Sequence, residues 1–185
     1  MTRALVVIDV QESFRARPSW AEFDNQQIAV AVQRLVDDAR AAGDLVVWVL
    51  HSEPGSGTPF DPASGLVRLF DELTAGPGEP VLVKTAHNAF TTTNLAQLLT
   101  ERQIHELTVC GIRTEQCVET TARLAADLGY AVTFVIDATA TSPVARPGSR
   151  TLTPAEIKER TEAALADRFA TVTTVDELLG VPLGG

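Results

Sequence analysis

The chain has 185 residues, 45% of them hydrophobic and 21% charged, which predicts one folded domain over residues 1–185 with a substantial core. Its formal net charge of −9 argues against nucleic acid and anionic membranes as partners. Two cysteines cannot form a disulfide framework, and we find neither a signal-peptide pattern nor an apolar stretch of membrane-spanning length, so we expect a cytoplasmic protein with free thiols.

Strand and helix patterns alternate along the whole chain. Apolar, β-branched runs predict strands at residues 4–10, 45–50, 81–83, 107–110, 132–136 and 170–175. Amphipathic segments between them predict helices at about residues 26–42, 66–73, 94–101, 115–128 and 154–167. This alternation predicts an α/β fold whose parallel sheet is covered by helices on both faces. Such a sheet builds its sites at the carboxyl ends of the strands.

Cys117 lies where the fourth predicted strand gives way to a helix. Thr114 is a candidate N-cap, which places Cys117 in the first helical turn. Unpaired N–H groups and the positive end of the helix dipole favour an anion there, so we expect a thiol with a lowered pKa and nucleophilic character. A free cysteine is commonly just a small buried residue, which is our interpretation of Cys110.

Two other strands end in charged residues, Asp9 and Lys84. Taken singly, Asp9 could cap a turn and Lys84 could be a surface lysine. Together with Cys117, however, they fall on the one edge of the sheet where sites form. A carboxylate can accept the thiol proton, an ammonium can stabilise the thiolate, and the sulfur can attack a carbonyl. The three residues therefore predict covalent catalysis.

Three motifs occur in order along the chain. They are Leu5-Val6-Val7-Ile8-Asp9-Val10-Gln11 with Phe14, then Val83-Lys84 followed by Asn88-Ala89-Phe90, then Gly111-Ile112-Arg113-Thr114-Glu115-Gln116-Cys117-Val118. With these motifs the sequence resembles the isochorismatase-like cysteine hydrolases, which include nicotinamidases and other small-amide hydrolases. The match continues to the strand ending at Ile136-Asp137-Ala138 and so covers nearly the whole chain.

The resemblance implies a three-layer, Rossmann-like α/β/α fold with a six-stranded parallel sheet of order 3-2-1-4-5-6. It implies a triad of Asp9 as general base, Lys84 as charge stabiliser and Cys117 as nucleophile. It also implies a cis peptide between Ile112 and Arg113, an oxyanion hole formed by the backbone N–H groups of Arg113 and Cys117, and assembly as a homodimer or homotetramer. In that order, a strand separates Lys84 from Asp9 by two steps of about 4.8 Å, and the sequence does not show how the gap closes.

Nicotinamidases of this family hold a metal through an Asp-x-His pair, but here Val49 occupies the Asp position before His51. We therefore expect neither a metal nor another cofactor, and we interpret His51 as a polar residue at the pocket. The expected substrate-binding residues are Phe14, Trp20, Gln11, His51, Phe60 and Asn88. Arg113 could bind a substrate carboxylate, form an ion pair with Glu115 or Glu119, or contact another subunit.

The leading hypothesis is a cysteine-dependent hydrolase that cleaves a small amide or related C–N substrate through a thioester. The alternatives are an isochorismatase-type vinyl-ether hydrolase, which needs no nucleophilic cysteine, and a non-enzymatic binding or redox-sensing module with an activated thiol. A sensor often needs a nearby resolving cysteine, and Cys110 is expected inside the sheet. Of these readings, amide hydrolysis is the one that needs the full set of Asp9, Lys84 and Cys117.

Overall fold

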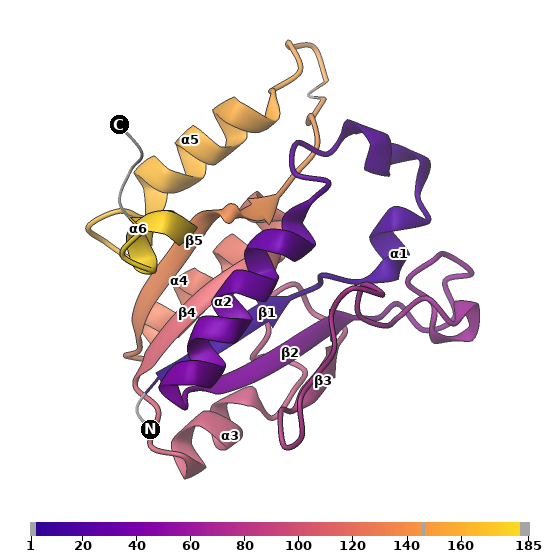
Figure 1. The fold of residues 1–185 in the computed structure, drawn as a ribbon. Helices are drawn as coiled ribbons and strands as arrows, with labels where there is room; N and C mark the ends of the chain where they lie inside the picture. Colours follow the sequence, from indigo (N-terminus) through magenta and orange to yellow (C-terminus); the bar gives the residue numbers. More distant parts are fainter. Residues whose placement is uncertain (1–2, 146, 182–185) are drawn as a thin grey trace.

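A six-stranded, all-parallel sheet forms the centre of the fold (Figure 1). This computed structural model describes residues 3–145 and 147–181. The strand order is β3-β2-β1-β4-β5-β6, as the family resemblance implied. The strands are β1 (Arg3–Ile8), β2 (Leu45–His51), β3 (Val81–Lys84), β4 (Glu106–Ile112), β5 (Ala131–Ala140) and β6 (Thr171–Thr173).

Helices cover both faces of this sheet (Figure 1). One face carries α2 (Ile28–Ala42) and α6 (Val175–Leu178), and the other carries α3 (Leu95–Glu101), α4 (Glu119–Asp127) and α5 (Pro154–Leu165). The segments after β1 and β2 hold short helical turns, α1 (Glu12–Arg15), η1 (Pro18–Glu22) and η2 (Pro62–Ser64). Among the described residues, no helix is both long and apolar enough to cross a membrane. The strand order reverses between β1 and β4, so their carboxyl ends mark the expected site.

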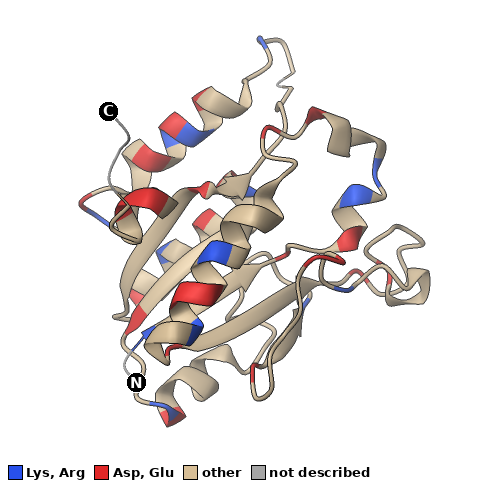
Figure 2. Cartoon of the chain, viewed as in Figure 1, with Lys and Arg blue, Asp and Glu red and all other residues tan. Residues whose placement is uncertain are grey.

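Alternate side chains of the strands enter two separate hydrophobic clusters. Val7 and Trp48 are buried on the α2 side, whereas Val6 and Val47 are buried on the α4 side. Figure 2 shows the charged residues mainly on helices and loops, with the strands almost free of them. Because β1 and β2 lose water on both faces, their sequences are continuous apolar runs.

The predicted helix at residues 66–73 is wrong. This segment contains an antiparallel bridge between Leu69 and Gln11, and it buries Phe70 and Leu73 in the cluster on the α2 side. Pairing with the chain after β1 therefore replaces the local helical preference. The predicted length of β5 is also too short, because the strand continues four residues past Ile136. The pairing of β4 with β5 shifts register between Val109 and Gly111 of β4 and then resumes.

Gly111 allows β4 to press against the end of β1. Its φ is +128°, and a Cβ atom at this position would overlap the carbonyl oxygen of Ile8. Only glycine fits such a backbone conformation and such a close approach. The contact brings the segment that leads to Cys117 against the segment that leads to Asp9.

We therefore expect Gly111→Ala to destabilise the fold by about 3 kcal/mol or more, because a methyl group there must move backbone. Gly129→Ala is the matched control: its φ is also positive, +92°, but nothing lies within 4 Å of the added Cβ. That control should lose about 1–2 kcal/mol. Urea unfolding midpoints measure both losses, and equal losses would show that the Gly111 contact is not specific.

Candidate active site

Asp9, Lys84 and Cys117 meet at the carboxyl edge of the sheet. Lys84 Nζ donates a hydrogen bond to Asp9 Oδ2 at 2.8 Å and lies 3.4 Å from Cys117 Sγ. Asp9 and Lys84 are completely buried, whereas Cys117 is 7% exposed, so Cys117 is the one residue of the three with any exposed surface. A carboxyl group, an ammonium and a thiol thus surround one point, as catalysis by the three residues requires.

Strand register explains how Lys84 spans the intervening strand. Ile8 lies beside Val49, whereas Lys84 lies beside His51, two residues nearer the carboxyl end of β2. The lysine side chain therefore passes over the end of β2 to reach Asp9, the residue after Ile8. Asp9 has a left-handed φ of +56°, which is uncommon outside glycine and typical of residues held at functional sites.

A π-helical turn, η3 (Thr114–Val118), carries Cys117. Its N-cap is Arg113 and no side chain caps it, so the predicted N-cap at Thr114 is wrong. The Thr114 hydroxyl instead donates to Thr139 Oγ1 on β5 at 2.8 Å. Single-turn π segments occur frequently at functional sites, but the sequence pattern does not distinguish them from an ordinary first turn.

Thr121 holds the backbone of Cys117 from the next turn, a contact that the sequence did not predict. Its hydroxyl donates to the carbonyl of Cys117 at 2.6 Å and accepts the N–H of Ala89 at 3.1 Å, which joins α4 to the loop after β3. The four-residue spacing from Cys117 permits this back-bonding, but nothing local predicts the second contact. The Ile112–Arg113 peptide before the turn is cis, which confirms that prediction.

The predicted lowering of the thiol pKa is wrong. The pKa of the Cys117 thiol is raised to about 12; burial is the largest cause, the Asp9 carboxylate acts in the same direction, and the Lys84 ammonium opposes both. Burial also raises the pKa of Asp9, against the lowering influence of Lys84. Loss of water around the sulfur thus outweighs the helix end that the sequence pattern suggested. In the resting site the sulfur keeps its proton until a base removes it.

Alkylation of Cys117 by iodoacetamide should therefore keep accelerating up to pH 10, by about tenfold per pH unit where deprotonation limits it. Peptide mass spectrometry reads Cys117 separately from Cys110. The latter is completely buried with a pKa raised to about 12, and it should label only after unfolding. A plateau in Cys117 labelling below pH 8 would contradict the proposed neutral thiol.

Gln11 was predicted to bind substrate, but its side chain is bonded inside the protein. It is completely buried; its Oε1 accepts the N–H of His51 at 2.7 Å, and its Nε2 donates to the carbonyl of His51 at 2.9 Å. His51 is half-buried, with Nδ1 3.2 Å from Lys84 Nζ and Nε2 3.5 Å from a Glu53 carboxylate oxygen. Gln11 thereby fixes the end of β2 beside the end of β1.

Of the three aromatic residues expected at the substrate, Phe60 is the one whose ring contacts His51. Phe60 meets the His51 ring at a centroid distance of 5.9 Å and meets Phe14 edge-on at 4.9 Å. Trp20 is half-buried and packs against other aromatic rings of the core cluster on the α2 side. Asn88 uses its side-chain oxygen on N–H groups two and three residues further along its own loop.

Arg113 forms contacts within the protein. Its Nε lies 3.2 Å from a Glu115 carboxylate oxygen, and its Nη2 donates to Thr141 Oγ1 at 3.3 Å and to the carbonyl of Ser142 at 3.0 Å. Of the roles left open by the sequence, the ion pair with Glu115 is the one that the structure contains. These contacts tie the residue after the cis peptide to the segment that follows β5.

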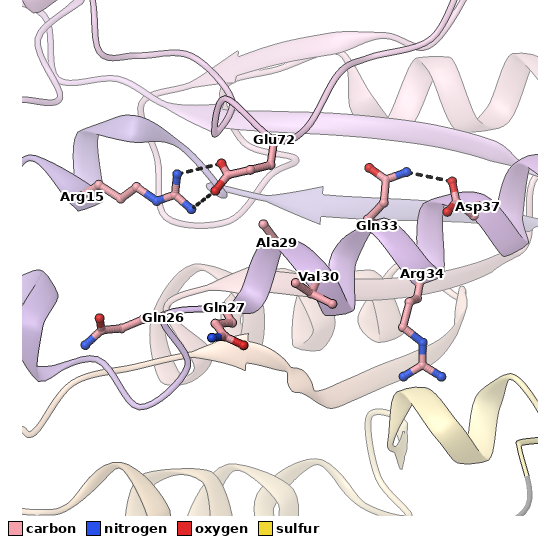
Figure 3. A pocket seen from close by; sticks show the side chains of 9 residues that line it. All are labelled: Arg15, Gln26, Gln27, Ala29, Val30, Gln33, Arg34, Asp37 and Glu72. Atoms are coloured by element: carbon pink, nitrogen blue, oxygen red, sulfur yellow. Dashed lines mark hydrogen bonds and ion pairs between the residues drawn. The ribbon is translucent and has the colours of Figure 1, made fainter.

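Two hollows lie on the surface near the segments that follow β1 and β2. One, of about 270 Å³, adjoins the surroundings of His51 and is lined by Ala16, Arg17, Pro18, Glu53, Thr58, Pro59 and Phe60. Another, of about 410 Å³, follows the outer side of α2, where Arg15 pairs with Glu72 (Figure 3). Neither hollow has Asp9, Lys84 or Cys117 among its lining residues, but Phe60 and Glu53 place the first one beside His51.

The donor set does not fit a metal of the nicotinamidase kind. Within residues 3–145 and 147–181, no three His, Cys, Asp or Glu side chains gather as ligands for a metal ion. Val49 occupies the Asp position and is completely buried, and His51 directs Nδ1 at Lys84. We therefore derive no step through a metal.

Comparison with known proteins identifies the family. The model of the isochorismatase domain matches residues 3–177. The chain belongs to the isochorismatase family. Among its relatives in this family, a streptothricin hydrolase of Streptomyces noursei is 38% identical, covering 92% of this chain and 68% of its own. The ureidoacrylate amidohydrolase RutB of Enterobacter sp. is 31% identical over 74% of each chain. A solved isochorismatase of Pseudomonas putida has a TM-score of 0.86 at 33% identity, covering 95% of this chain and 89% of that one.

Proposed function

We propose that this isochorismatase-family hydrolase cleaves a small carboxamide or related C–N substrate through a thioester on Cys117. The observation that carries the proposal is the placement of Lys84 Nζ, 2.8 Å from Asp9 and 3.4 Å from the Cys117 sulfur, in a buried site. Relatives named for amide substrates, the streptothricin hydrolase and the ureidoacrylate amidohydrolase, support this reaction class.

Asp9 acts as the proton carrier. Its Oδ2 accepts from Lys84, while its Oδ1 is buried without a hydrogen-bond partner and is free to take a proton. In the first step Asp9 accepts the thiol proton as Cys117 sulfur bonds to the substrate carbonyl carbon. Asp9 then returns that proton to the nitrogen as the C–N bond breaks, which releases ammonia or an amine. The raised pKa of Asp9 suits a group that must both accept and donate.

Water completes the cycle. Asp9 takes a proton from a water molecule, whose oxygen attacks the thioester carbonyl, and the proton returns to the departing sulfur. The products are a carboxylic acid and the original thiol. The Lys84 ammonium stabilises the developing thiolate, and the backbone N–H groups of Arg113 and Cys117 are the proposed donors to the oxyanion. Neither step requires a cofactor.

The redox-sensing alternative fits the cysteine placement less well. Cys117 belongs to the core cluster on the α4 side of the sheet, whereas Cys110 belongs to the cluster on the α2 side. The sheet therefore separates the two thiols, and Cys110 is not placed to resolve an oxidised Cys117. A sensor would also have no use for a buried base such as Asp9.

A panel of small carboxamides and ureides, read by ammonia release, tests the proposed reaction. Cys117→Ala should abolish turnover of any amide that the protein hydrolyses, with an unchanged circular dichroism spectrum, because a methyl group cannot form the acyl intermediate. Asp9→Asn should lower kcat by about 100-fold or more, because an amide accepts no proton. Turnover that survives Cys117→Ala would sink the covalent mechanism.

Chelators should leave the rate unchanged, since the proposed steps use only protein groups and water. The measurement is ammonia release by enzyme dialysed against a chelator such as EDTA, compared with enzyme dialysed against plain buffer. Inhibition that added zinc or iron specifically reverses would show that a metal takes part.

A further inference from the structure

We infer that His51 is a positioning residue for Lys84: its neutral imidazole accepts one ammonium proton at Nδ1 and thereby directs the remaining two at Asp9 and Cys117. The inference rests on the proposed function, because it concerns the group that stabilises the thiolate there. It assigns His51 a task distinct from the substrate contact or metal ligation that a histidine at this place suggests.

The argument begins with the number of protons on Lys84. An ammonium has three N–H donors and no acceptor. Around Lys84 Nζ lie Asp9 Oδ2 at 2.8 Å, His51 Nδ1 at 3.2 Å and Cys117 Sγ at 3.4 Å. The lysine side chain is 0% exposed, so its N–H groups cannot bond to bulk solvent. Any N–H group without an acceptor in the protein would therefore be unsatisfied, which is unfavourable. Three acceptors for three protons fix the direction of each.

The tautomer of His51 follows from this count. Nδ1 can accept from the ammonium only if it carries a lone pair, so the ring proton must reside on Nε2. That nitrogen lies 3.5 Å from a carboxylate oxygen of Glu53, which favours a proton there. Protonation of His51 would remove the lone pair and place a second cation beside Lys84.

The backbone of His51 is held independently of its ring. Gln11 bonds both the N–H and the carbonyl of His51, and Gln11 is itself buried and bonded to Ser13. Phe60 lies against the ring. These contacts limit where the imidazole can move, which is what a positioning residue requires.

The charged groups that face His51 come from three segments: Asp9 after β1, Glu53 after β2, and Lys84 and His87 at and after β3. Burial lowers the pKa of His51 below its ordinary value; Lys84 and His87 lower it further, and Asp9 and Glu53 oppose them. The neutral ring is therefore the form present at neutral pH, and acid disrupts the arrangement.

Nuclear magnetic resonance on the intact protein tests the inference without any substrate. The chain has three histidines, so ¹⁵N-edited imidazole spectra can be assigned with the single variants of His51, His87 and His105. We expect His51 as the Nε2–H tautomer, neutral down to a pH below 6.5, and we expect Lys84→Met to raise its pKa by removing a neighbouring cation. An Nδ1–H tautomer, or a pKa that Lys84→Met leaves in place, would overturn the inference.

Alkylation of Cys117 by iodoacetamide at pH 8.5 gives the functional readout. His51→Leu removes the acceptor and should slow alkylation about tenfold, because the ammonium no longer holds its direction. His51→Asn carries an oxygen in place of Nδ1 and should recover most of that rate. His105→Asn, at an exposed histidine outside the site, should not change it.

Equal rates in His51→Leu and His51→Asn would overturn the positioning role. Neither measurement depends on amide turnover. Failure of the amide panel with a confirmed His51 tautomer would reject the proposed substrate class alone, and the opposite result would reject only the role of His51.

Discussion

The ion pair between Lys84 and Asp9 is the interaction on which the rest of the site depends. Both groups are completely buried, and moving two charges out of water is unfavourable unless their contacts are nearly ideal. Removing one partner of such a pair typically destabilises a protein by about 3–5 kcal/mol, since the other charge stays buried. The ends of three neighbouring strands must therefore stop in a fixed register.

Several contacts outside the triad hold that register. Gln11 joins the ends of β1 and β2 through the backbone of His51, beyond the last paired residues of β1. Gly111 lets β4 approach the end of β1. Thr121 links the helix after Cys117 to the loop after β3. The geometry of the site is thus a property of the surrounding backbone as much as of the side chains of Asp9, Lys84 and Cys117.

Much of this arrangement was predictable from the sequence, for a physical reason. Asp9 stands out because it follows β1, a continuous apolar run buried on both faces, and Lys84 stands out because it ends the short apolar run of the edge strand β3. The strand order and the cis peptide came from the family resemblance, because periodicity contains no information about either. The triad could be proposed because all its members follow strands of one parallel sheet.

The predictions that were wrong concern features that contacts between distant parts of the chain determine. The expected pKa of Cys117 relied on a local helix end, whereas burial and Asp9 determine it. The predicted helix at residues 66–73 followed a local pattern that pairing of Leu69 with Gln11 overrides. Gln11 was wrongly expected at the substrate, because a sequence cannot show which backbone groups a buried side chain will contact.

The sheet separates the two thiols, and this separation determines how an oxidised Cys117 can be reduced again. Cys117 is the partly exposed cysteine, and Cys110 is completely buried in the cluster on the other face. If Cys117 is oxidised to a sulfenic acid, Cys110 cannot form an internal disulfide with it. An external thiol must then reduce Cys117 before further oxidation to a sulfinic or sulfonic acid destroys the thiol permanently. The working lifetime of each molecule is therefore tied to the reducing power of its surroundings.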